Sequence, residues 1–80
     1  MLFIATFFTH FGAIKFREFA KKQNLECILM PVPRVLSSSC GTCARYKAEH
    51  WDIGFSDEAL EGVFSLDKGD GYEQLFKAKE

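Results

Sequence analysis

The sequence predicts an α+β fold: a small ferredoxin-like sheet of the split βαβ type, with one main amphipathic helix and a C-terminal hairpin. Three observations support it. Residues 2–8 and 26–30 are short apolar runs, and an amphipathic stretch over residues 10–23 separates them. Strand, helix and strand at this spacing form a βαβ unit, whose two strands run parallel. The chain has 80 residues, 48% of them apolar and nine of them Phe, which suits a single domain over residues 1–80 with an aromatic core.

The first half of the chain contains the clearest signals. The apolar run over residues 2–8 is too short for a helix and is typical of a central strand covered on both faces. Thr9 is placed to cap a helix over residues 10–23, whose apolar and charged residues gather on opposite faces. Asn24 suits the left-handed position after a helix. The second strand, residues 26–30, ends at Pro31, because proline cannot donate to a strand ladder.

The second half predicts shorter elements. Residues 42–47 could form a strand or a helix, and the alternation of residue types along them favours the strand. Residues 48–56 form a polar connection, and Ser56 opens a short helical turn with acidic residues at its start. Residues 63–66 and 72–76 flank a glycine-bearing turn over residues 67–71, which is the pattern of a β-hairpin.

Charge and targeting signals restrict the class of protein. The net charge is −1, which argues against nucleic acid as a partner. Residues 1–47 carry +5 and residues 48–80 carry −6. Two solvated faces are the simpler interpretation, but a positive half also suits an anionic ligand or an acidic partner. The apolar start lacks a basic leader region and is too short to span a membrane. We therefore expect a cytoplasmic protein without a membrane partner, whose three cysteines stay reduced.

The segment with the most chemistry is a Cys-x-x-Cys motif. Cys40 and Cys43 follow the serine run 37–39 and lie between Arg34 and Arg45. A thiol acts as a nucleophile or a metal ligand only as the thiolate, and nearby cations favour that form. We therefore expect Cys40 to be the reactive thiolate, Cys43 to be a resolving thiol, and both arginines to assist Cys40.

Gly41, between the two cysteines, permits a positive φ. Such a turn lets successive backbone amides point at an anion. Ser39 and Gly41 are therefore the expected contacts of a group bound at Cys40.

Several chemistries fit such a motif. A thioredoxin-type oxidoreductase would carry it between the first strand and the first helix, and here it follows the second strand. A zinc or iron–sulfur site needs four ligands, so Cys40 and Cys43 would have to be shared across a dimer or joined by Cys27, His10 or His50. A persulfide on Cys40, released as Cys43 forms a disulfide, is a further possibility. The cysteines could also be incidental to an interaction module.

The residues also resemble a known family. The opening strand with Thr9 to Ala13, the segment 29–34 with its Pro-x-Pro-Arg sequence, and the Ser-Ser-Ser-Cys-Gly sequence at residues 37–41 are similar to a family of small bacterial proteins. These are the selenium/sulfur carrier protein-like proteins, a domain of unknown function called DUF3343. The resemblance covers residues 2–47 well and the C-terminal third loosely. It implies a carrier role for Cys40, and Cys43 departs from a pattern that has the first cysteine alone.

Together these observations predict a cytoplasmic carrier of sulfur or selenium. Cys40 would hold the atom as a persulfide or selenopersulfide, with no resident cofactor or metal. Its partners would be sulfur or selenium donor and acceptor proteins. The polar residues assemble no evident general acid, base and cleft, so we assign no enzymatic turnover. One amphipathic helix covers only one sheet face, so we also expect the C-terminal segment or a second copy, in a homodimer, to cover the other.

Overall fold

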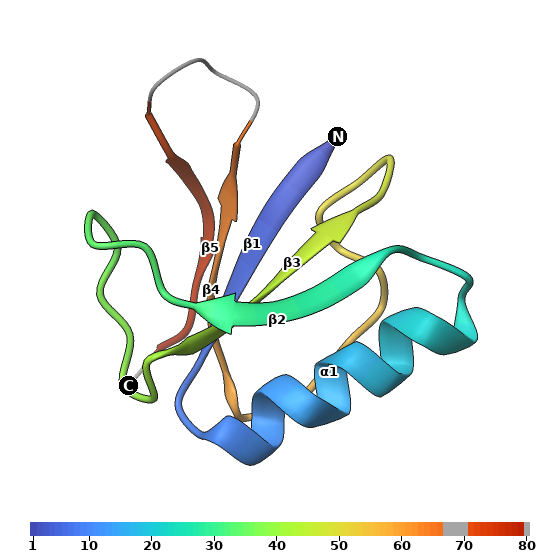
Figure 1. Ribbon diagram of the computed structural model, residues 1–80, viewed down its shortest axis with the longest axis horizontal. Helices are drawn as coiled ribbons and strands as arrows, with labels where there is room; N and C mark the ends of the chain where they lie inside the picture. The colour runs from blue at the N-terminus through green and yellow to red at the C-terminus, as the bar shows by residue number, and fades with distance from the viewer. Residues whose placement is uncertain (67–70, 80) are drawn as a thin grey trace.

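The computed structural model describes residues 1–66 and 71–79, which form one helix and five strands (Figure 1). In chain order these are β1 (Leu2–Phe7), α1 (His10–Lys22), β2 (Cys27–Pro31), β3 (Thr42–Lys47), β4 (Leu60–Ser65) and β5 (Glu73–Lys77). The strands make one sheet in the order β2-β3-β1-β4-β5, in which all neighbours are antiparallel. The helix packs on one face of this sheet. The predicted α+β, ferredoxin-like fold is confirmed.

The first two strands form a split βαβ unit. Both β1 and β2 pair antiparallel with β3, which lies between them. They therefore run in the same direction, as predicted, without bonding to each other. The strand interpretation of residues 42–47 is also confirmed, and this strand brings the end of the cysteine motif into the centre of the sheet.

The helix begins and ends at the residues that its caps predict. The hydroxyl of Thr9 accepts a hydrogen bond from the N–H of Gly12 at 3.0 Å, and Asn24 has φ +60°. A Cβ atom on Gly12 would lie only 2.4 Å from Cβ of Ala59. Glycine at this position therefore lets the first turn of α1 approach the segment before β4 closely.

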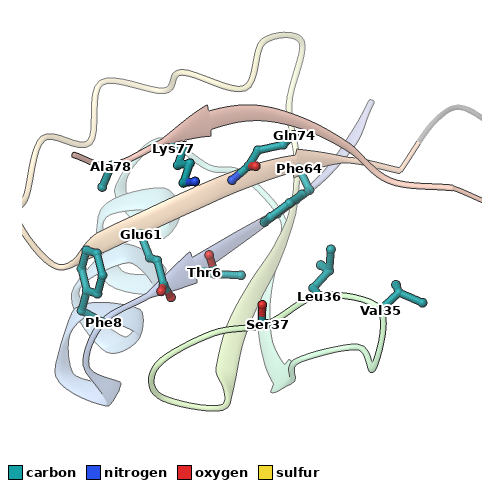
Figure 2. A pocket seen from close by; sticks show the side chains of 10 residues that line it. All are labelled: Thr6, Phe8, Val35, Leu36, Ser37, Glu61, Phe64, Gln74, Lys77 and Ala78. Carbon is teal, nitrogen blue, oxygen red and sulfur yellow. The ribbon is translucent and has the colours of Figure 1, made fainter. Parts of the chain in front are cut away.

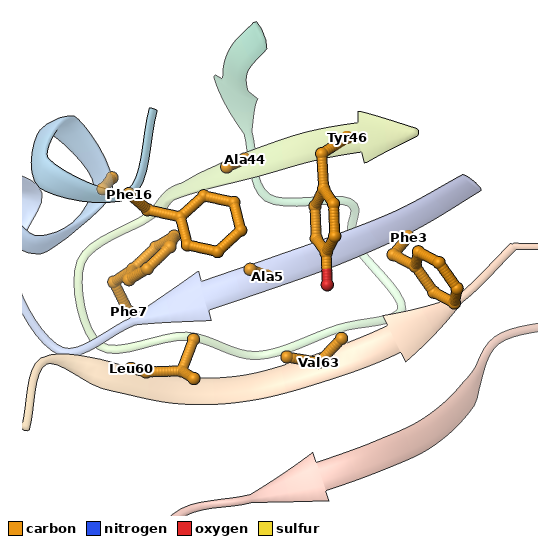
Figure 3. Packing of buried hydrophobic residues seen from close by; sticks show 9 residues of the cluster. Phe3, Ala5, Phe7, Phe16, Ala44, Tyr46, Leu60 and Val63 are labelled. Carbon is orange, nitrogen blue, oxygen red and sulfur yellow. The ribbon is translucent and has the colours of Figure 1, made fainter. Parts of the chain in front are cut away.

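The core lies between α1 and the sheet (Figure 3). Phe16 of the helix is its centre, with ring centroids 5.5 Å from Phe7, 4.9 Å from Tyr46 and 5.1 Å from Phe55. Tilted and edge-on ring pairs of this kind add to the stabilisation from burial. Three of the nine Phe side chains, Phe3, Phe7 and Phe16, are thus fully buried in this core.

The connection 48–59 covers the rest of this face. The Tyr46 hydroxyl donates to the Trp51 carbonyl at 2.6 Å, and the Trp51 ring stacks on Phe76 of β5 at 5.6 Å. The helical turn expected near residue 56 is one hydrogen-bonded turn, from the Leu60 N–H to the Asp57 carbonyl at 3.1 Å. The strand β4 then begins at Leu60, earlier than predicted.

The strands β4 and β5 confirm the predicted hairpin, while residues 67–70 of its turn lie outside the described residues. In the described part of the chain, no helix has the length and apolar character needed to cross a membrane.

The opposite face of the sheet is covered partly by the segment between β2 and β3, not by a second helix. We call residues 32–41 the cysteine loop. On the face beneath it, Ile4, Thr6 and Cys43 are at most 1% exposed. The loop lies over part of this face, so the expectation that the C-terminal segment or a second copy covers it concerns the part that the loop leaves open.

Candidate functional site

The two ends of the cysteine loop are hydrogen-bonded to each other, and its second half is hydrogen-bonded to the sheet. At its base, the N–H of Val32 donates to the carbonyl of Gly41 at 3.1 Å. Further along, the Ser38 hydroxyl donates to the carbonyl of Phe7, at the end of β1, at 3.1 Å. Backbone groups left over at the strand ends are thus satisfied by the loop. These contacts place Cys40 beside the end of β1.

A second attachment involves a residue that the sequence did not single out. The N–H of Ser39 donates to Oε1 of Glu61 and its hydroxyl donates to Oε2, both at 3.1 Å. The Ser39 N–H is therefore occupied by a carboxylate, which leaves it unavailable to the anion predicted above. An available signal was Gly62, since an isolated glycine in a strand often marks a bulge that redirects its neighbour.

Cys40 itself is half-buried and packs against the core. Its thiol donates to the carbonyl of Thr42 at 3.1 Å, and its sulfur accepts from the N–H of Thr42 at 3.4 Å. Gly41 has φ +74°, the left-handed conformation that the sequence anticipated and that glycine adopts at low cost. The carbonyl contact suits the protonated thiol, whereas an N–H aimed at sulfur stabilises negative charge there.

His10 also belongs to this region. It is the first residue of α1, and its Nδ1 lies 3.3 Å from the Thr42 hydroxyl. Because Thr42 also contacts the Cys40 sulfur, one residue joins the imidazole, the helix start and the thiol. The signal for this contact was weak, because it depends on the pairing of β1 with β3.

The other two cysteines are in less reactive surroundings. Cys43 is the second residue of β3 and is fully buried, with its sulfur 3.7 Å from the carbonyl of Pro31. Burial, and then the nearby Cys40 thiol, raise the pKa of Cys43 to about 11. Burial likewise raises the pKa of Cys27 to about 11, and Arg17 offsets this in part. Both thiols are therefore protonated at neutral pH.

Both arginines expected to assist Cys40 are exposed. Arg34 lies in the cysteine loop. Arg45 lies in β3, on the same face as Cys43 two residues earlier. Within residues 1–66 and 71–79, neither arginine side chain makes a hydrogen bond or an ion pair. Their expected influence on Cys40 would therefore be through-space electrostatics, which solvent and salt screen.

The ligand sets considered for a metal are not brought together within one chain. Across the described residues, no three His, Cys, Asp or Glu side chains form a group able to hold an ion. His50 lies in the connection after β3, where its Nδ1 accepts from the Asp52 N–H at 3.1 Å and its ring stacks on Trp51.

A cavity lies between the cysteine loop and the uncovered part of the sheet (Figure 2). It has a volume of about 270 Å³ and is lined by Leu36 and Ser37 of the loop and by Glu61 and Phe64 of β4, among others. In Figure 2 the Glu61 carboxylate points toward the loop, and the Phe64 ring lies nearer Leu36. The cavity therefore adjoins the attachment of Ser39.

The comparison with protein families finds a match over most of the chain. The model of a family described as "Putative Se/S carrier protein-like" matches residues 2–53, about two thirds of the chain. This range includes β1, α1, β2, the cysteine loop and β3. Neither a curated protein nor a solved structure matches the chain significantly.

Proposed function

From the premise that this chain belongs to the Se/S carrier protein-like family, we propose that it carries a single sulfur or selenium atom on Cys40. The atom would be held as a persulfide or selenopersulfide and passed between a donor thiol and an acceptor thiol on other proteins. The cytoplasm, where thiols stay reduced, is the compartment that suits this chemistry.

The observation that carries the proposal is the contrast among the three thiols. Cys27 and Cys43 have pKa values of about 11 because they are buried, so neither supplies thiolate at neutral pH. Cys40 lies in a turn, is half-buried, and has the Thr42 N–H directed at its sulfur. It is therefore the cysteine best placed to act as a nucleophile.

The proposed transfer is an exchange without net oxidation. The Cys40 thiolate attacks the outer sulfur of a donor persulfide, a new S–S bond forms on Cys40, and the donor leaves as a thiolate. In the second half, an acceptor thiolate attacks the same outer sulfur and Cys40 leaves as a thiolate. With selenium as the outer atom, the bond formed and broken is S–Se.

Cys43 offers a second route, which its burial does not favour. Its thiolate would attack Sγ of Cys40, form a Cys40–Cys43 disulfide and expel the outer sulfur as hydrosulfide. This would require Cys43 to leave its position against Pro31 and lose a proton whose pKa is about 11. We therefore propose that loading and direct transfer proceed without Cys43.

We further propose that Arg34 and Arg45 favour the anionic forms of Cys40 from a distance. Both are exposed, so the effect should weaken as salt is added. Arg34→Ala is the variant of choice, because Arg34 lies in the same loop. We expect Arg34→Ala to load more slowly than wild type at low salt and at the same rate as wild type at high salt. An identical loading rate at every salt concentration would assign Arg34 to the scaffold.

The carrier proposal is tested by intact mass after incubation with inorganic polysulfide, followed by removal of the reagent. Wild type, Cys27→Ser and Cys43→Ser should each gain the mass of one sulfur atom, and Cys40→Ser should gain none. Metal analysis of untreated protein belongs to the same experiment. Loading of Cys40→Ser, or stoichiometric zinc or iron bound by wild type, would contradict the proposal.

A further inference from the structure

The strand β4 contains a bulge at Glu61. In the pairing of β1 with β4, Thr6 faces Gly62 and Phe7 faces Leu60, so Glu61 is the extra residue of β4 at this point. A bulge of this kind changes the direction of the side chain that it displaces. The backbone of Glu61 is fixed from the other side, because its carbonyl accepts from the Ala78 N–H at 2.9 Å.

Gly62 allows the strands to close around the bulge. A Cβ atom at this position would lie 3.2 Å from the hydroxyl oxygen of Thr6 and 3.2 Å from the carbonyl of Phe76. These distances are shorter than ordinary contacts, so a larger residue would push β1 and β5 away. The sequence Glu61-Gly62 thus gives both a redirected carboxylate and the space for it.

The redirected carboxylate meets the residue next to Cys40. Each oxygen of Glu61 accepts one hydrogen bond from Ser39, from the N–H and from the hydroxyl, at 3.1 Å. Two parallel bonds to an ionised group restrict orientation as well as distance. They fix the backbone immediately before Cys40, while the contact between Val32 and Gly41 fixes it immediately after.

We propose that Glu61 is a positioning residue for Cys40. By holding Ser39, its carboxylate keeps the Cys40 sulfur against the Thr42 N–H, so that the loaded atom is shielded from stray thiols. This inference rests on the proposed carrier function, but its geometric part, the link from Glu61 to the Thr42 N–H, can be measured without loading.

The test compares four variants of the full chain. Glu61→Ala removes both acceptors and Ser39→Ala removes one bond. Glu61→Gln can keep both, because its amide oxygen accepts the Ser39 N–H and its amide nitrogen donates to the Ser39 hydroxyl. Glu58→Ala is the matched control, since Glu58 is exposed and close in the sequence. Thermal unfolding establishes that each variant is folded.

Two measurements follow on each folded variant. Hydrogen exchange of the Thr42 amide should be faster in Glu61→Ala, on the order of tenfold for the loss of charge-assisted bonds. It should stay within about twofold of wild type in Glu61→Gln and Glu58→Ala. Loss of sulfur from the loaded protein to added dithiothreitol should follow the same order.

The outcomes separate the two proposals. Unchanged Thr42 exchange in Glu61→Ala overturns the positioning role, whether or not the protein loads. Failure of Glu61→Gln to restore slow sulfur release would also overturn it, because charge rather than hydrogen bonding would then be responsible. If wild type itself does not load, the carrier proposal fails, and Thr42 exchange still decides whether Glu61 orders the site. If Glu61→Ala is unfolded, Ser39→Ala takes its place in the test. For Ser39→Ala we expect Thr42 exchange and sulfur release at rates between those of wild type and those expected for Glu61→Ala.

Discussion

The surroundings of the three cysteines predict a strong selectivity in alkylation. At pH 7.5, a thiol with a pKa of about 11 is ionised to roughly 3 parts in 10,000, whereas an ordinary cysteine with a pKa of about 8.5 is ionised to about one part in ten. Ionisation alone therefore makes Cys27 and Cys43 about three-hundred-fold slower than a free cysteine derivative. Burial of Cys43 slows its reaction further. We expect early label on folded protein to be confined to Cys40.

The assay is iodoacetamide labelling with a free cysteine derivative as an internal reference, followed by peptide mapping at several times. The pH dependence adds a second criterion. Between pH 8 and 10 the rates at Cys27 and Cys43 should rise about tenfold per pH unit, because both pKa values lie above this window. Labelling of Cys43 at a rate close to the reference, in protein that thermal unfolding shows to be folded, would refute this account of the site.

Three further predictions concern the scaffold. Gly12→Ala should destabilise the fold by about 1–3 kcal/mol in urea unfolding, because the new Cβ would clash with Ala59; unchanged stability would refute the close approach. Lys15 bonds the Asp57 carboxylate at 2.7 Å, and this bond and that of the Ala59 N–H lower the Asp57 pKa. The ionised pair therefore stabilises the fold above the unfolded pKa, and stability should fall as acid protonates Asp57, with a smaller acid dependence in Lys15→Met. Light scattering should give a homodimer that Ile28→Glu disrupts, since Ile28 is 51% exposed; a wild-type monomer at micromolar concentration would argue against it.

Most local structure could be predicted because its signals are local. The strand at residues 2–8, the Thr9 cap and the left-handed Asn24 each depend on a few neighbouring residues, and the structure shows all three. The parallel direction of β1 and β2 could also be predicted, from the helix between them. The position of β3 between these two strands could not be predicted, because the choice of neighbouring strand depends on contacts between residues far apart in the sequence.

The candidate site was predicted only in part, for the same reason. The turn at Gly41 is a property of the motif, and its positive φ is confirmed. The burial of Cys43 follows from the pairing of β3 with both β1 and β2, and no spacing rule expresses it. Glu61 reaches Ser39 only because β4 has a bulge. Local sequence patterns therefore locate the loop. Long-range strand pairing determines that Cys43 is buried and that Glu61 bonds Ser39.

The location of the carried atom tests the central claim most directly. Protein treated with polysulfide is blocked with iodoacetamide, digested and mapped by fragment-ion mass spectrometry. The account predicts an additional sulfur on Cys40, between the cysteine sulfur and the label, and none on Cys27 or Cys43. An additional sulfur on either buried cysteine, or no additional sulfur on any of the three, would contradict it.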